Sequence, residues 1–100
     1  MDPSFQVEFY PKAVKDLDKL GNKNEALGLV KEIETELSVS PWPFGKKKKK
    51  IKGISYPLYR LRIETANDSY RIFYLVEKSK VIVLRVVKKK DAEKAIKSLR

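Results

Sequence analysis

Three consecutive segments in the C-terminal half have the residue patterns of β-strands, and these patterns constrain the fold more than any other feature. They are residues 58–65, 70–77 and 80–87, separated by connections of only a few residues. The first segment alternates strictly between apolar and polar residues, and the third is apolar at nearly every position. Successive side chains of a β-strand point to opposite faces, so a period of two predicts strands. Turns this short join antiparallel neighbours. We therefore expect a meander of three antiparallel strands.

The alternation also assigns side chains to the two faces of the meander. One face should carry the apolar set Tyr59, Leu61, Ile63, Tyr70, Ile72, Tyr74 and Val76. The opposite face should carry Arg60, Arg62 and Glu64 from the first strand, with Arg71, Phe73 and Leu75 from the second. The third strand is apolar at nearly every position, which is typical of a central strand covered on both faces.

The N-terminal half predicts one strand and two helices. Residues 4–10 alternate, with Phe5, Val7 and Phe9 on one face, and Pro11 ends this strand. Residues 11–20 and 23–38 follow as helices, with Gly21 ending the first and Asn22 or Asn24 capping the second. The expected apolar stripes are Ala13, Val14, Leu17 and Leu20 in the first helix, and Leu27, Val30, Ile33 and Leu37 in the second.

These elements predict an α+β fold for a single domain spanning residues 1–100. An N-terminal strand should join a mostly antiparallel four-stranded sheet, with the two-helix hairpin on one face and a terminal helix over residues 91–100. The other face should turn Arg60, Arg62 and, less clearly, Arg71 toward solvent. A chain of 100 residues has no room for a second domain.

The segment between the helices and the meander is a loop followed by a run of lysines. Two prolines and a glycine over residues 38–45 predict the loop, whose Trp42 and Phe44 either tuck under the sheet or cap the hairpin, or else stay exposed to stack on bases. Residues 46–50 are all lysine, a run that is usually a solvated face or a mobile loop.

The charge is distributed unevenly along the chain. Residues 1–45 carry five lysines and eight acidic residues, whereas residues 46–100 carry 18 basic and five acidic residues. A basic half on a small domain favours a polyanionic partner, most often nucleic acid. The alternative is a generic solubilising charge.

Several classes of chemistry are excluded by what the sequence lacks. It contains no cysteine and no histidine, which removes disulfides, thiolate and imidazole metal sites, and the commonest general base near neutral pH. Its four glycines are scattered and form no phosphate loop. We expect no metal and no cofactor. No apolar run approaches a membrane span and no signal peptide is evident, so we expect a cytoplasmic protein.

A basic sheet face can still act on RNA. Lysine and arginine can hold a phosphodiester and stabilise its pentacoordinate transition state. The 2′-hydroxyl of RNA can be the nucleophile, and a desolvated lysine among other cations can serve as base. The alternative is that these residues only bind phosphate or an acidic protein partner.

Several stretches resemble the RelE/ParE family of toxins from bacterial and archaeal toxin–antitoxin pairs. They are Lys52-Gly53, Leu58-Tyr59-Arg60-Leu61-Arg62-Ile63, Tyr70-Arg71-Ile72-Phe73-Tyr74 and Val81-Ile82-Val83-Leu84-Arg85-Val86-Val87, together with the opening Phe9-Tyr10-Pro11-Lys12-Ala13-Val14-Lys15-Asp16-Leu17. The resemblance implies a compact sheet covered by a helical hairpin. For RelE-like members it implies a metal-independent endoribonuclease that cuts mRNA on the ribosome and is neutralised by an acidic antitoxin.

The resemblance also implies roles for individual residues. The family's transition-state arginine falls on Arg71, and its basic pair on the preceding strand falls on Arg60 and Arg62. Residues 88–90 are lysines where many members have a His-Arg or Lys-Arg step, and Glu93 lies near the place of a family tyrosine. The candidate catalytic residues are therefore Arg71, Arg60, Arg62 and Lys89, and the candidate RNA-binding residues are Lys50, Lys52, Lys88 and Lys90.

Two alternatives remain open. ParE-like members of the same fold lack the nuclease residues and poison DNA gyrase, and the missing tyrosine favours that function. The chain can also be a basic nucleic-acid-binding domain that has lost its toxicity.

Overall fold

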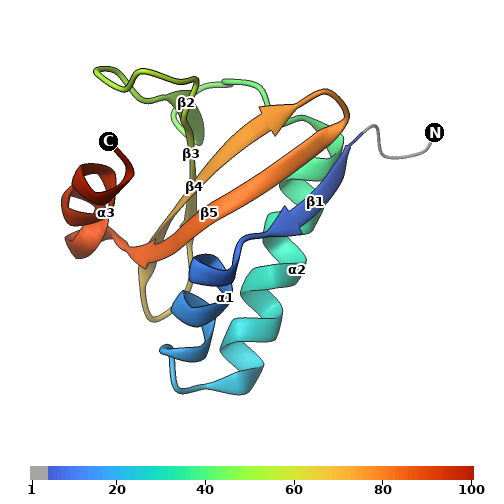
Figure 1. Ribbon diagram of the computed structural model, residues 1–100. Coiled ribbons are helices and arrows are strands. Elements are labelled where there is room, and N and C mark those ends of the chain that lie inside the picture. The colour runs from blue at the N-terminus through green and yellow to red at the C-terminus, as the bar shows by residue number, and fades with distance from the viewer. Residues whose placement is uncertain (1–4) are drawn as a thin grey trace.

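The computed structural model describes residues 5–100, which form five strands, three α-helices and one 3₁₀ turn (Figure 1). In chain order these elements are β1 (Gln6–Phe9), α1 (Pro11–Asp18), α2 (Lys23–Val39), β2 (Lys48–Lys50), β3 (Tyr59–Glu64), β4 (Ser69–Glu77), β5 (Lys80–Lys88), η1 (Lys89–Asp91) and α3 (Ala92–Leu99). The predicted order of strands and helices is confirmed. Ser4, the first residue of the predicted N-terminal strand, lies outside the described residues.

The sheet confirms the predicted α+β class but contains one strand more than expected. Its strand order is β1-β5-β4-β3-β2, with β1 parallel to β5 and the other pairs antiparallel. The fifth strand is β2, three lysines at the sheet edge, where we expected a solvated or mobile lysine run. Lysines are typical of edge strands because their charges discourage pairing with another chain.

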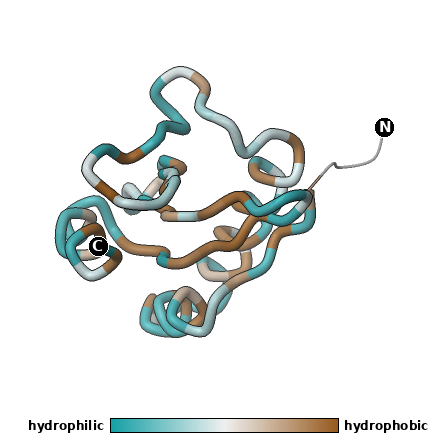
Figure 2. The backbone as a smooth tube through the Cα atoms, turned by 45° about the horizontal axis from the view of Figure 1, so that its top comes forward, coloured by the Kyte–Doolittle hydropathy of each residue, from teal (hydrophilic) through white to brown (hydrophobic). Residues whose placement is uncertain are grey.

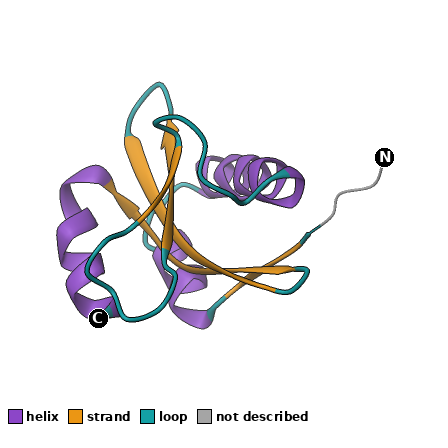
Figure 3. Cartoon of the chain, turned by 90° about the horizontal axis from the view of Figure 1, so that it is seen from above, coloured by secondary structure: helices purple, strands orange, loops and turns teal. Residues whose placement is uncertain are grey.

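Apolar clusters lie on both faces of the twisted sheet. The α1–α2 hairpin covers one face, over Leu61, Ile63, Ile72, Tyr74 and Val83. On the other face, α3 and the loop of residues 51–58 pack over Phe73, Leu84 and Val87. Figure 3 shows α2 and α3 on opposite sides of the strands, and Figure 2 shows the apolar residues concentrated along them. The second face of the sheet is therefore partly covered by α3 and the loop, and only the rest of it is open to solvent.

The buried stripes of both helices differ from those predicted. Val14 is 45% exposed and Leu27 is 62% exposed, whereas Asp16 and Leu29 are buried. In α2 the buried residues Leu29, Ile33 and Leu37 are spaced by four. The same spacing places Glu25 on this face, and its Oε1 accepts a hydrogen bond of 2.7 Å from the Tyr70 hydroxyl. Each core-facing side includes an acidic residue, Asp16 in α1 and Glu25 in α2. For this reason the apolar pattern alone did not identify the buried face of either helix.

Asp16 joins α1 to the unpaired edge of β5. β1 pairs with β5 only as far as Val83, so the backbone N–H of Val86 has no neighbouring strand on that side. That N–H donates to Asp16 Oδ2 at 2.9 Å, and Arg85 donates to the same carboxylate through Nε at 2.8 Å and Nη2 at 3.1 Å. A register shift between β4 and β5 leaves Leu84 unmatched next to Arg85. Asp16 thus closes the sheet edge where β1 ends.

No helix within residues 5–100 has the length and apolarity needed to cross a membrane.

Replacing Asp16 should strongly destabilise the fold. Asp16→Ala leaves the Arg85 guanidinium and the Val86 N–H without their acceptor, and breaking such a buried pair typically costs about 3–5 kcal/mol of unfolding free energy. The measurement is equilibrium denaturation in urea. Asp18→Ala, at an exposed position one half-turn away, is the matched control and should change the unfolding free energy by less than about 0.5 kcal/mol. Equal effects of the two substitutions would contradict this account of Asp16.

Candidate nucleic-acid interface

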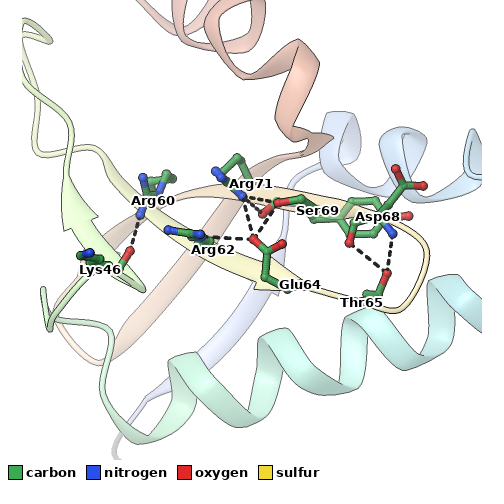
Figure 4. A network of polar contacts seen from close by, with 9 residues as sticks. Lys46, Arg60, Arg62, Glu64, Thr65, Asp68, Ser69 and Arg71 are labelled. Atoms are coloured by element: carbon green, nitrogen blue, oxygen red, sulfur yellow. Dashed lines mark hydrogen bonds and ion pairs between the residues drawn. The ribbon is translucent and has the colours of Figure 1, made fainter.

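Three arginines gather on the second face of the sheet, where β3 and β4 run side by side. Arg62 lies directly opposite Arg71, and Arg60 follows on the same face two residues earlier, opposite Phe73 (Figure 4). Directly opposed residues of antiparallel strands share a face, so the register alone brings the three guanidinium-bearing positions together. This is the grouping that the alternation predicted.

Arg71 does not turn toward solvent as we had expected. Its side chain is only 8% exposed. Nη1 donates to Ser69 Oγ at 2.8 Å and to the Tyr70 carbonyl at 3.0 Å. Both acceptors belong to its own strand, which curls the side chain back along β4. The guanidinium is therefore held in a fixed position at the floor of the site.

Glu64 lies among the arginines, and we had not assigned it to the site. Its Oε2 accepts hydrogen bonds from Ser69 Oγ at 2.7 Å and Arg62 Nε at 3.1 Å, and lies 3.6 Å from Arg71 Nη1. The hydrogen bond from Ser69, and after it the one from Arg62, lower the pKa of this carboxyl. The signal was present in the sequence, because Glu64 continues the alternation of Arg60 and Arg62.

Arg60 is held less completely than its neighbours. Nη2 donates to the Lys46 carbonyl at 2.7 Å. Its Nε is buried and has no hydrogen-bond partner among the described residues. Burial, followed by the positive charges of Arg71 and Arg62, lowers the pKa of this guanidinium. The three arginines therefore repel one another at close range.

The predicted lysines of residues 88–90 line a cavity beside this network. The cavity has a volume of about 490 Å³, and Asp68 and Ser69 form its other wall. Lys88 is paired with Tyr70 of the hairpin-side core, so the register places it on the other face from the arginines. Its Nζ forms an ion pair with Asp68 Oδ2 at 3.3 Å, while Lys89 and Lys90 are exposed. A second cavity of about 360 Å³ is lined by Glu32, Lys46, Lys47, Arg62 and Glu64. Ser69, which lines the first cavity, donates a hydrogen bond to Glu64, which lines the second.

The other predicted RNA-binding lysines are not part of this cluster. The register places Lys50 opposite Tyr59, a residue of the hairpin-side core, and Lys52 is exposed in the loop after β2. Lys49, which we had not singled out, lies opposite Arg60 and so shares the arginine face. Lys48 is buried, with Nζ donating to the Ser40 carbonyl at 2.8 Å and lying 3.2 Å from Glu36. Because residues 46–50 are all lysine, no alternation of apolar and polar residues indicates which of them face each side of the sheet.

The two loop aromatics have separate positions. Trp42 makes edge-on contacts with Phe5 and Tyr59, at ring separations of 6.0 and 6.1 Å. Trp42 thus packs by its edge against the sheet but remains 47% exposed, so the tucked alternative is confirmed only in part. Phe44 is 80% exposed, so tucking was the wrong prediction for this ring.

The cluster is suited to holding a phosphodiester. It combines a buried arginine at its floor, two partly exposed arginines beside it and a rim of lysines, and preorganised cations of this kind stabilise charge that develops on phosphate oxygens. Within residues 5–100, no group of three or more acidic side chains is placed to hold a metal ion.

Comparisons with known proteins agree on the fold. The model of one family, described as ParE toxin of type II toxin-antitoxin system, parDE, matches residues 7–93. A mutant of the Escherichia coli toxin RelE in the free state is 24% identical, with a TM-score of 0.65 and coverage of 97% of this chain and 99% of that one. RelE in the archaeal RelE–RelB complex from Pyrococcus horikoshii is 24% identical, with a TM-score of 0.63 and coverage of 86% and 96%. A copper-bound mutant toxin from Helicobacter pylori is 22% identical, with a TM-score of 0.59 and coverage of 87% and 97%. No curated protein sequence gave a significant match.

Charge reversal at adjacent lysines of β2 should separate the two faces of the sheet. Lys49→Glu places a negative charge beside Arg60 and should weaken binding of a single-stranded RNA oligonucleotide about tenfold at low salt, through a lost phosphate contact and a new repulsion. Lys50→Glu changes the net charge equally but on the opposite face, and should weaken binding less than about threefold. Fluorescence anisotropy measures both. Equal losses would place the nucleic acid elsewhere.

Proposed function

The chain belongs to the ParE toxin family of type II toxin–antitoxin systems, a match that spans residues 7–93, and we propose that it inhibits translation as an endoribonuclease that cuts ribosome-bound mRNA. The observation that carries this proposal is the arginine cluster. Arg60, Arg62 and Arg71 share one face of a rigid strand pair, beside a cavity lined by lysines of residues 88–90. Such a set of cations fits the charge of an RNA backbone.

The proposed reaction uses the RNA's own 2′-hydroxyl as nucleophile. A 2′-oxygen–phosphorus bond forms while the bond from phosphorus to the 5′-oxygen breaks, leaving a 2′,3′-cyclic phosphate and a 5′-hydroxyl. Arg71 stabilises the extra negative charge of the pentacoordinate state, and Arg60 and Arg62 hold the non-bridging oxygens. This mechanism needs no metal-activated water.

Lys89 is our candidate for the base that removes the 2′-hydroxyl proton. It lies at the cavity rim between Lys88 and Lys90. Acting as the base requires the Lys89 amine to be neutral and within reach of the 2′-hydroxyl when RNA binds. The departing 5′-oxygen takes its proton from solvent.

One observation favours a second function, the inhibition of DNA gyrase without cleavage of nucleic acid. Arg71 is almost fully buried and already lies 3.6 Å from the Glu64 carboxylate. If that arrangement persisted with RNA bound, Arg71 would be unable to reach the reacting phosphate. Expressing the protein in growing cells and mapping both mRNA 5′ ends and gyrase-linked DNA breaks in one culture distinguishes the two functions.

We also propose an antitoxin partner that covers the same arginines with an acidic segment. Seating carboxylates across Arg60, Arg62 and Arg71 would neutralise the cluster and block RNA in one step.

Replacing Arg71 should slow cleavage more than it weakens binding. Removing one preorganised cation typically costs on the order of 3 kcal/mol of barrier, so Arg71→Ala should lower single-turnover cleavage of ribosome-bound mRNA about a hundredfold at saturating protein. Arg71→Lys preserves the buried charge but not the two-pronged geometry, and should also be slow. Neutralising Lys46 and Lys49, which leaves the buried Lys48 in place, should mainly raise the protein concentration needed for saturation.

Cleavage by Arg71→Ala at the wild-type rate, once saturated, would overturn the assignment of Arg71. Failure of the wild-type protein to cut mRNA would overturn the endoribonuclease proposal itself.

The antitoxin complex should be sensitive to salt. Charge-assisted contacts to partly exposed arginines are screened at about 0.5 M salt, so isothermal titration calorimetry should show a clear loss of affinity relative to low salt. Arg60→Glu should weaken the complex at low salt. An affinity that neither change alters would place the antitoxin on the apolar helix surfaces instead.

A further inference from the structure

We infer that Glu64 occupies the position of the substrate phosphate in the free protein and must be displaced when RNA binds. This inference rests on the proposed function and adds a regulatory residue to the same site. The carboxylate oxygen Oε2 accepts hydrogen bonds from Ser69 Oγ at 2.7 Å and Arg62 Nε at 3.1 Å, and lies 3.6 Å from Arg71 Nη1. One anionic oxygen therefore converges with three donors from two strands, as a non-bridging phosphate oxygen would.

Glu64 lies where the backbone of an extended single-stranded RNA would pass. Glu64 lines the cavity that contains Lys46, Lys47 and Arg62, and Ser69 lines the cavity that contains the lysines of residues 88–90. The hydrogen bond between Glu64 and Ser69 joins a wall residue of one basic cavity to a wall residue of the other. A single-stranded backbone that passes from one cavity to the other across this bond would bring a phosphate into competition with the carboxylate for Arg62 and Arg71.

The contacts of Glu64 are also those of a side chain that can leave. Its side chain is 55% exposed, whereas that of Arg71 is 8% exposed. Departure of Glu64 therefore moves one solvated side chain and leaves the arginine floor in place. The free cluster is not fully satisfied by Glu64, because the buried Arg60 Nε has no hydrogen-bond partner among residues 5–100. Burial, and after it the charges of Arg71 and Arg62, lower the pKa of Arg60.

A phosphodiester satisfies the cluster better than Glu64 does. It presents two non-bridging oxygens, whereas Glu64 contacts the arginines through Oε2 alone among the described contacts of residues 5–100. Arginine forks bind such paired oxygens with two parallel hydrogen bonds. Glu64 therefore weakens the binding of any anion by occupying the site.

The test compares Glu64→Gln with Glu77→Gln. Glutamine retains the length of the side chain and an oxygen that can accept from Ser69, but removes the negative charge. Glu77 is exposed at the far end of β4, so its replacement changes the net charge equally without touching the site. The probe is a single-stranded RNA oligonucleotide with 2′-O-methyl groups, which cannot be cleaved, and binding is measured by fluorescence anisotropy.

Glu64→Gln should bind this probe about tenfold more tightly than the wild type, the equivalent of one displaced charge-assisted contact. Glu77→Gln should bind less than about twofold more tightly, as expected for a distant, screened charge. In cleavage of ribosome-bound mRNA, Glu64→Gln should lower the half-saturating protein concentration, which a role confined to folding stability would not do.

Two results would overturn the inference. Binding by Glu64→Gln no tighter than by Glu77→Gln would mean that Glu64 does not compete with phosphate. Loss of the saturated cleavage rate in Glu64→Gln would assign Glu64 as the general base instead. Tighter binding by Glu64→Gln with no cleavage by either protein would uphold the competition and overturn the proposed endoribonuclease function.

Discussion

The carboxylate of Asp16 is the contact on which the C-terminal half of the molecule depends. It accepts from Arg85 Nε and Nη2 and from the Val86 backbone N–H, and so fixes α1 against the part of β5 that no neighbouring strand supports on that side. Arg85 Nη1 in turn donates to Ser98 of α3 at 3.3 Å. A single buried ion pair thus connects α1, β5 and α3.

Because β5 leads directly into η1, this contact also sets where the lysines of residues 88–90 stand relative to the arginines of β3 and β4. A buried pair of this kind owes its value to complete hydrogen bonding, since removal of either partner leaves a charge without solvation.

The arginine cluster presents the opposite electrostatic situation, with like charges collected at close range. Electrostatic repulsion between three guanidinium groups on two adjacent strands is unfavourable. Nearby acceptor groups compensate for part of it. Backbone carbonyls of Lys46 and Tyr70 accept from Arg60 and Arg71, and Glu64 supplies a carboxylate among them. The compensation is incomplete at Arg60, whose buried Nε lacks a partner within residues 5–100. Under the proposed function this residual repulsion favours binding, because an arriving phosphate would relieve it. The strands supply the rigidity that keeps the cluster from relaxing by moving apart.

The sequence predicts the strands and helices well because their apolar periods are strong, and it fails where a charged residue lies inside a buried stripe. Asp16 and Glu25 both occupy core-facing helix positions, so the apolar pattern pointed instead to Val14 and Leu27, which are exposed. For the same reason the sequence did not reveal Lys48, which is buried in β2 by its contacts with the Ser40 carbonyl and Glu36.

For the site, alternation was enough to place Arg60 and Arg62 on one face. It was not enough to show that Arg71 is buried, because that depends on Ser69 and on a backbone carbonyl. Lys49 and Lys50 differ only in a register that five identical residues do not encode.

The turn between β3 and β4 explains why the site has one rigid part and one adjustable part. Thr65 accepts through Oγ1 from the Asp68 N–H at 3.0 Å, and its backbone N–H donates to the Asp68 carbonyl at 2.8 Å. This closed turn fixes Glu64 opposite Ser69 and therefore Arg62 opposite Arg71. It also carries Asp68, which holds Lys88 in an ion pair at 3.3 Å.

The arginine spacing is thus determined by covalent geometry and backbone hydrogen bonds, whereas Lys89 and Lys90 extend from a short 3₁₀ turn into solvent. Exposed lysines can follow a moving backbone and contribute charge at low entropic cost, but they cannot define the position of one phosphorus atom. Under the proposed function, selection of a single phosphodiester would therefore come from the arginines and from Glu64, the exposed acidic group that shares their contacts.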